Sequence, residues 1–116
     1  MSWTGLLVSV RNADEATEAL AGGSAIVDVK DPLAGPLGAA APATVAAIAR
    51  RVGSAVPWTL AGGELLDRGA DARAGGARLL RFIDDVLAAL DSLPAPAAVK
   101  IGLSAGLWMT AISWNF

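Results

Sequence analysis

Short apolar runs alternate with helix-type patterns along the chain, and this alternation restricts the possible folds more than any other feature. Four runs are apolar enough to be covered on both faces, as strands of parallel sheets are. We expect these strands at residues 6–10, 25–29, 55–60 and 97–103. Because helix-type segments separate them, the order is βαβαβαβ. The sequence therefore predicts an α/β fold of parallel βα repeats joined by right-handed crossovers.

Three helices are expected between the four strands. The first follows a cap at Asn12 or Asp14, whose side chains can accept hydrogen bonds from the first helical turn. The second begins at Pro42, a residue that suits the first turn of a helix. The third covers roughly residues 70–90. Its buried side is expected to consist of Ala77, Leu80, Ile83, Val86, Leu87 and Leu90.

The composition excludes several classes of function. With 116 residues, of which 54% are hydrophobic and 17% charged, the chain has the length of one domain and little polar surface, so we expect a homo-oligomer. A net charge of -2 gives no electrostatic attraction to nucleic acid or to an anionic membrane. Without cysteine or histidine there is no thiolate or imidazole metal ligand and no Ser-His-Asp triad.

The sequence also shows no sign of a membrane or secretory address. No apolar run reaches the length of about 18 residues that a membrane span needs. The start of the chain, Met1 to Thr4, lacks the basic region of a signal peptide. A cytoplasmic location is therefore expected.

The chain has only two lysines, and both stand at the ends of expected strands. Lys30 follows residues 25–29, and Lys100 lies in residues 97–103, whereas the other seven cations are arginines. A lysine amine in an apolar site can attack a carbonyl, which a guanidinium cannot do. Parallel α/β sheets carry their chemistry at the carboxyl ends of their strands. Lys30 and Lys100 are thus candidate catalytic residues; the alternative is that each lysine ends its strand by reaching into solvent.

Three further residues are candidates for substrate binding. Asp28 precedes Lys30 by two positions and shares its face of the strand, so its carboxylate could bind the lysine or a substrate hydroxyl. Alternatively, it is a buried acid whose partners are backbone or loop amides. Gly35 and Gly38 bracket a loop whose amides could hold a phosphate, although a turn that contains proline also accounts for them. Trp58 is expected to pack in the core.

Several segments resemble the (5-formylfuran-3-yl)methyl phosphate synthase family, which makes the furan precursor of methanofuran-type cofactors. They are Leu-Leu-Val-Ser-Val at 6–10, Ala-Gly-Gly-Ser-Ala-Ile-Val-Asp-Val-Lys-Asp-Pro at 21–32, Gly-Pro-Leu-Gly-Ala at 35–39 and Val-Lys-Ile-Gly-Leu at 99–103. The resemblance implies a TIM barrel and a carbon-oxygen lyase that condenses two molecules of glyceraldehyde 3-phosphate, a phosphorylated aldehyde, without metal or organic cofactor. Carried over by motif, Lys30 would form a Schiff base with the substrate and Lys100 would accept a proton.

Four strands and three helices correspond to half of a TIM barrel, which has eight βα units in about 250 residues. We expect residues 1–103 to be the N-terminal half of such a barrel domain. Residues 104–116 have no charge and no periodic stripe, so we expect a divergent apolar tail. A truncated or frame-shifted copy with weak or no activity would explain both features. The alternative is that the tail covers an open edge of the sheet.

Two functions from other classes stay open. One is a non-enzymatic half-barrel that forms a homodimer by pairing its first and fourth strands across a two-fold axis. The other is a small doubly wound sheet that binds a nucleotide or phosphate at helix N-termini. The Gly-Gly pairs at 22, 62 and 75 suggest the second function, although none forms a G-x-G-x-x-G or P-loop pattern.

Overall fold

The computed structural model describes residues 5–34, 38–65, 72–102 and 108–112. Its centre is a sheet of five strands in the order β1-β2-β3-β4-β5. The first four strands are parallel to one another, as the sequence predicts. They are β1 (Leu7–Val10), β2 (Ile26–Val29), β3 (Trp58–Glu64) and β4 (Ala98–Gly102).

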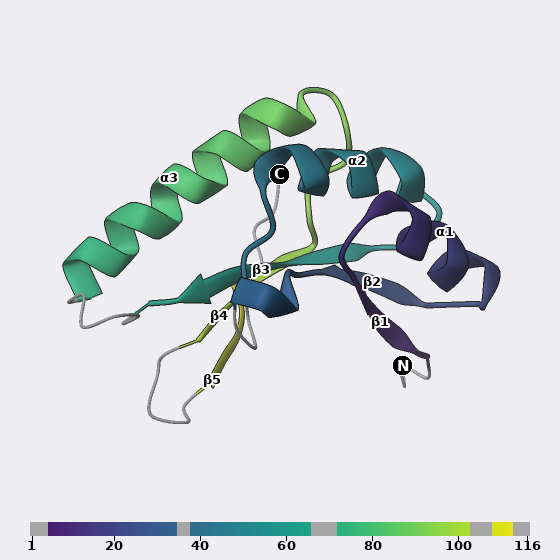
Figure 1. The fold of residues 1–116 in the computed structure, drawn as a ribbon, viewed down its shortest axis with the longest axis horizontal. Helices are drawn as coiled ribbons and strands as arrows, with labels where there is room; N and C mark the ends of the chain where they lie inside the picture. Colours follow the sequence, from purple (N-terminus) through teal and green to yellow (C-terminus); the bar gives the residue numbers. More distant parts are fainter. Residues whose placement is uncertain (1–4, 35–37, 66–71, 103–107, 113–116) are drawn as a thin grey trace.

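The helices α1 (Ala13–Ala21), α2 (Pro42–Val52) and α3 (Ala72–Leu90) connect these strands. All three lie over one face of the sheet, with α1 beside α2 and α2 beside α3 (Figure 1). A doubly wound sheet has helices on both faces and a reversal of strand order. Since the sheet has neither feature in the described part of the chain, the doubly wound alternative is wrong. In the described part of the chain, no helix is long and apolar enough to span a membrane.

Two of the predicted helix starts are confirmed. The Asn12 side chain accepts a hydrogen bond from the backbone N–H of Glu15 at 2.8 Å, which satisfies one of the free amides of the first turn of α1. Pro42 is the first residue of α2. The short 3-10 helix η1 (Pro32–Ala34) lies in the expected loop between β2 and α2.

The core lies between the sheet and the helices. Alternate residues of each strand point toward the helices, because successive side chains of a strand point to opposite faces. Trp58 is among them, and its Nε1 donates a hydrogen bond to the backbone oxygen of Pro94 at 3.2 Å. The prediction that Trp58 packs in the core is confirmed. The strand residues buried in this core are Val10, Val27, Val29, Trp58, Leu60, Val99 and Ile101.

Helix α3 buries a stripe that differs in part from the expected one. Val86 and Leu90 are buried as predicted and Ile83 is partly buried, but Leu80 is 65% exposed. Ala77 and Leu87 are also exposed. The buried leucine of this turn is Leu79.

Helix α3 is rotated relative to the expected orientation, so that Leu79 faces the core in place of Leu80. The close approach of α3 to the end of β3 accounts for this rotation. Gly75 is buried, and a Cβ atom there would collide with the carbonyl group of Leu65. Leu79, one turn later on the same side of the helix, therefore packs inward. From the sequence alone, it cannot be decided whether Leu79 or Leu80 packs into the core.

Strand β3 starts at Trp58 instead of near residue 55, and it continues beyond the expected end through two glycines to Glu64. At Gly62, side-chain atoms of Leu79 and Val99 lie 3.0 and 3.1 Å from the position that a Cβ would take. Glycine at this position lets α3 and β4 pack closely against the strand.

The fifth strand was not predicted as a strand, but its position agrees with the alternative that the tail covers an open edge of the sheet. β5 (Trp108–Ile112) pairs with β4 in the antiparallel direction and lies in the segment expected to be a divergent tail. Its Trp, Thr and Ile residues are typical of strands. Because β5 occupies the outer edge of β4, this edge is not available for the dimer that would pair first and fourth strands.

Candidate active site

A row of polar side chains crosses the sheet on the face opposite the helices. Ser9 of β1 is in register with Asp28 of β2, and Asp28 is in register with Thr59 of β3. Lys100 stands on the next strand, β4, opposite Ala61 of β3. These side chains share a face because their strand neighbours point toward the helices. Four adjacent parallel strands thus each contribute one polar side chain.

Asp28 is the centre of this row. It is only 1% exposed, and its Oδ1 accepts a hydrogen bond from Thr59 Oγ1 at 2.7 Å and lies 2.9 Å from Lys100 Nζ. Its Oδ2 accepts a hydrogen bond from Ser9 Oγ at 3.1 Å. A buried carboxylate is costly unless charged and hydrogen-bonding groups surround it. Of the two interpretations of Asp28, the structure favours a lysine partner, which is Lys100 and not the sequence neighbour Lys30.

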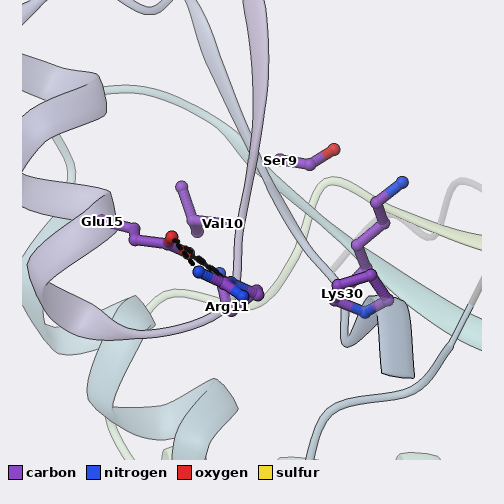
Figure 2. Close-up of a pocket in the computed structure, with 6 residues that line it drawn as sticks. Ser9, Val10, Arg11, Glu15 and Lys30 are labelled. Atoms are coloured by element: carbon purple, nitrogen blue, oxygen red, sulfur yellow. Dashed lines mark hydrogen bonds and ion pairs between the residues drawn. The ribbon is translucent and has the colours of Figure 1, made fainter. Parts of the chain in front are cut away.

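Lys30 stands directly after β2, where its backbone N–H donates to the Val10 oxygen at 3.2 Å. Its side chain lines a pocket of about 220 Å³ together with Ser9, Val10, Arg11, Glu15 and Pro32 (Figure 2). Among the described residues, the Lys30 amine has no hydrogen-bond or ion-pair partner. An amine in this situation is open to a ligand.

The two lysines lie on the same face of the sheet, on strands that only β3 separates. Lys100 forms an ion pair with Asp28, and Asp28 precedes Lys30 by two residues in the sequence. The convergence of the two amines over one substrate stays a prediction.

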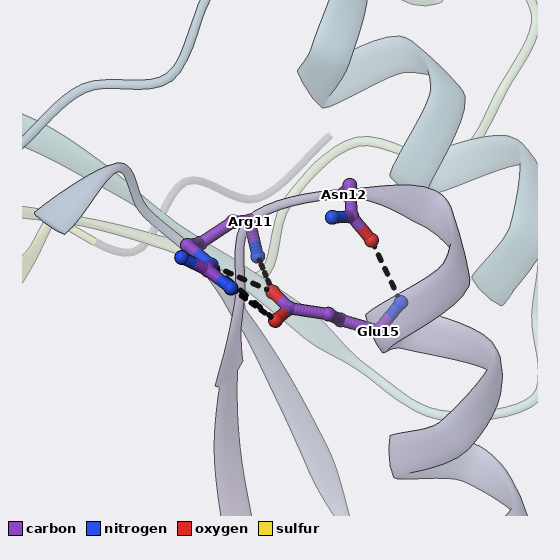
Figure 3. A network of polar contacts seen from close by, with 3 residues as sticks. All are labelled: Arg11, Asn12 and Glu15. Atoms are coloured by element: carbon purple, nitrogen blue, oxygen red, sulfur yellow. Dashed lines mark hydrogen bonds and ion pairs between the residues drawn. The ribbon is translucent and has the colours of Figure 1, made fainter. Parts of the chain in front are cut away.

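Arg11 and Glu15 form a third feature of the site, at the end of β1 (Figure 3). Arg11 Nη2 lies 2.9 Å from Glu15 Oε2, Nε lies 3.2 and 3.3 Å from the two carboxylate oxygens, and the Arg11 backbone N–H donates to Oε1 at 2.7 Å. Hydrogen bonding to Glu15 raises the pKa of the Arg11 guanidinium above its ordinary value. Hydrogen bonds from Arg11 lower the pKa of the Glu15 carboxyl.

Gly38 has a structural role that the sequence analysis considers as an alternative. It is buried, and its oxygen accepts a hydrogen bond from the Asp31 backbone N–H at 2.9 Å. A Cβ there would collide with the backbone of Asp31 and with Ala34. Gly35 lies outside the described residues, so the phosphate-binding loop stays a prediction.

The Gly-Gly pairs also have structural explanations. Gly22 and Gly23 end α1, and Gly23 has a φ of 85°, which glycine adopts without strain. The pair at 62 lies in β3 and the pair at 75 lies within α3. None of the three pairs forms a loop that leads directly into a helix N-terminus, as phosphate-binding loops do.

The family model for 4-HFC-P synthase matches residues 6–83, which is more than half of the sequence. The chain belongs to the 4-HFC-P synthase family. A protein of Methylorubrum extorquens, provisionally named (5-formylfuran-3-yl)methyl phosphate synthase, is 53% identical over 58 residues. These residues are 49% of this chain and 25% of that protein, so the similarity spans only a quarter of the relative.

For this member of the 4-HFC-P synthase family, the matched region contains Ser9, Asp28, Lys30 and Thr59, whereas Lys100 lies beyond it. The sequence analysis names Asp28 and both lysines but misses Ser9, Thr59 and Arg11. Ser9 could have been found as a hydroxyl within the apolar strand β1, and Thr59 likewise within β3. Arg11 follows β1 immediately, at the end of the strand where parallel sheets carry their functional groups.

Proposed function

We propose that this chain carries the Schiff-base site of a 4-HFC-P synthase that condenses two molecules of glyceraldehyde 3-phosphate through Lys30. The main observation in support is the contrast between the two amines. Lys30 has no polar partner among the described residues and lines a pocket, whereas Lys100 is bound to a buried carboxylate. One amine is therefore available to a ligand, and the other is held in a fixed position.

The proposed chemistry gives a role to Lys30, Lys100 and Asp28. The Lys30 amine attacks the aldehyde carbon, and loss of water leaves a protonated imine. The imine acidifies the neighbouring carbon. Lys100, after its ammonium has lost a proton to solvent, takes up the proton of this carbon. The Asp28 carboxylate, 2.9 Å from Lys100 Nζ, stabilises the ammonium that this transfer creates. The resulting enamine carbon attacks the second aldehyde. The product retains one of the two phosphates, so ring formation must release the other together with water, and hydrolysis of the remaining imine frees the Lys30 amine.

We also propose that the sheet is part of a TIM barrel. Four parallel strands in sequence order, with every helix on one face, have the winding of such a barrel. The row around Asp28 then faces the barrel interior, and Lys30 stands at the carboxyl end of its strand, where barrel enzymes carry catalytic residues. The antiparallel β5 departs from this pattern, because the fifth strand of a complete barrel is parallel to the fourth.

Borohydride trapping tests the proposal on the chain itself. Reduction in the presence of glyceraldehyde 3-phosphate should fix a stable secondary amine at Lys30, which peptide mass spectrometry can locate. Lys30→Arg should abolish the adduct with an unchanged circular dichroism spectrum, because arginine keeps the charge but forms no imine.

Lys100→Arg is the matched control, since it preserves a cation next to Asp28. In this variant the adduct should still form at Lys30. An adduct distributed equally over Lys30, Lys100 and the amino terminus, or no adduct at all, would contradict the proposed Schiff base.

A further inference from the structure

The pocket beside Lys30 contains a second cation, Arg11, for which the proposed imine chemistry has no use. The charged residues that line the pocket are Lys30, Arg11 and Glu15, so the lining carries a net positive charge. Its volume of about 220 Å³ is below the range of about 300–1,000 Å³ that is typical of sites for drug-sized ligands. Both properties suit a small anion.

The arginine is held in position before any ligand arrives. Glu15 binds Nε and Nη2 of the Arg11 guanidinium and also its backbone N–H. Among the described residues, Nη1 of Arg11 has no partner. A guanidinium has five donors in a rigid fork, so one edge can bind a carboxylate while another remains open to a second oxyanion. An ordered guanidinium loses less conformational freedom when it binds.

We infer that Arg11, positioned by Glu15, binds the phosphate group of the aldehyde whose carbonyl carbon reacts with Lys30. This inference rests on the proposed function, because it requires an aldehyde at Lys30. Figure 2 shows the amine end of Lys30 on the Ser9 side of the pocket, with the Arg11–Glu15 pair on the other side. The inference requires a three-carbon aldehyde with a terminal phosphate to reach from one of these two sides of the pocket to the other.

The test compares two aldehydes that differ only in the phosphate. Lys30 trapping by borohydride is titrated with glyceraldehyde 3-phosphate and with glyceraldehyde. Arg11→Ala should raise the half-saturating concentration of the phosphorylated aldehyde by about 10-fold to 100-fold, as expected for loss of a charge-assisted hydrogen bond. The shift for glyceraldehyde should be at least about tenfold smaller. Inorganic phosphate should compete with glyceraldehyde 3-phosphate in the parent protein and much less in the variant.

The matched control is Arg51→Ala. Arg51 is an exposed arginine at the end of α2 that contacts the Thr17 hydroxyl and lies 3.9 Å from Asp14, outside this pocket. It should alter neither titration. Glu15→Gln should raise the half-saturating concentration of glyceraldehyde 3-phosphate less than Arg11→Ala does. It loosens the Arg11 guanidinium but leaves the positive charge of Arg11 in place.

Three outcomes would overturn the inference. If Arg11→Ala trapped both aldehydes as the parent does, Arg11 would have no part in binding, and the Schiff base would stand without it. If Arg11→Ala raised the half-saturating concentrations of both aldehydes equally, Arg11 would have a structural role only. If the parent protein formed no Lys30 adduct with either aldehyde, the proposed function and the inference would fail together.

Discussion

At the residue scale, the buried carboxylate of Asp28 links stability to the candidate chemistry. Asp28→Asn leaves the Lys100 ammonium without its anion, and Lys100→Met leaves a buried anion with hydroxyl donors only. Each change should lower the free energy of unfolding by about 1–3 kcal/mol. The double variant should lose less free energy of unfolding than the two single variants lose together. The difference is a coupling energy of about 0.5–3 kcal/mol, because each single change leaves one charge unpaired. Urea denaturation of the four proteins measures this coupling.

An exposed ion pair of the same chain provides the control cycle. Arg51 Nη1 and Asp14 Oδ1 are 3.9 Å apart, and the Asp14 side chain is almost fully exposed. Their coupling energy should be below about 1 kcal/mol, as is usual for surface pairs. Equal coupling in both cycles would show that the Asp28–Lys100 pair is no stronger than a surface contact.

Glu15 provides a second prediction for a single residue. Hydrogen bonds from Arg11 lower the pKa of its carboxyl, so the pair stabilises the start of α1 fully above the ordinary glutamate pKa of about 4.3. This contribution is lost as the pH falls through the lower pKa of the folded state. Carboxyl NMR titration should find the Glu15 pKa below its ordinary value, and Arg11→Ala should raise it. A Glu15 pKa that does not change in this variant would exclude the pair in solution.

At the element scale, adjacent glycines in α3 should respond to alanine in opposite ways. A Cβ at Gly76 would meet no atom within 4 Å, so Gly76→Ala should stabilise the protein by up to about 1 kcal/mol through helix propensity. A Cβ at Gly75 would collide with the backbone of Leu65, so Gly75→Ala should destabilise it by about 1–3 kcal/mol. Thermal and urea unfolding of both variants measure the difference. The same sign for both would mean that α3 does not pack against Leu65 as described.

Helix α3 illustrates which features of the fold can be predicted from the sequence and which cannot. The strand order, the helix starts at Asn12 and Pro42 and the family follow from local patterns, because caps, prolines and apolar runs act over a few residues. The rotation of α3 does not, since it depends on the backbone of Leu65, which contacts Gly75 only in the folded chain. β5 was missed for a related reason, because its strand is defined by pairing with β4.

In the candidate site, too, some residues can be recognised from the sequence and others only from the fold. The lysines and Asp28 could be selected because a charged residue in or next to an apolar strand is conspicuous. Ser9 and Thr59 were overlooked because single hydroxyl residues are common in strands. Only the register of β1, β2 and β3 brings both hydroxyls to one carboxylate.

At the scale of the whole molecule, β1 is one of the two edge strands that the sheet has in the described part of the chain. β5 covers β4, whereas β1 pairs only with β2 in the described part of the chain. β1 carries Leu7, which is 45% exposed on the face opposite the helices. An uncovered edge strand with exposed apolar side chains promotes association between chains, and a lysine on such a strand opposes it. We therefore predict self-association of the chain that Leu7→Lys weakens.

Sedimentation velocity over a range of concentrations measures this association. The parent chain should form dimers or larger species as its concentration rises, and Leu7→Lys should shift the distribution toward the monomer. Leu33→Lys is the matched control, because Leu33 is 94% exposed but lies on η1, away from the β1 edge. If Leu33→Lys had the same effect as Leu7→Lys, added charge alone would be responsible. A parent chain that stays monomeric at every concentration would show that the open edge of β1 does not associate, and the expected homo-oligomer would then have to form elsewhere or not at all.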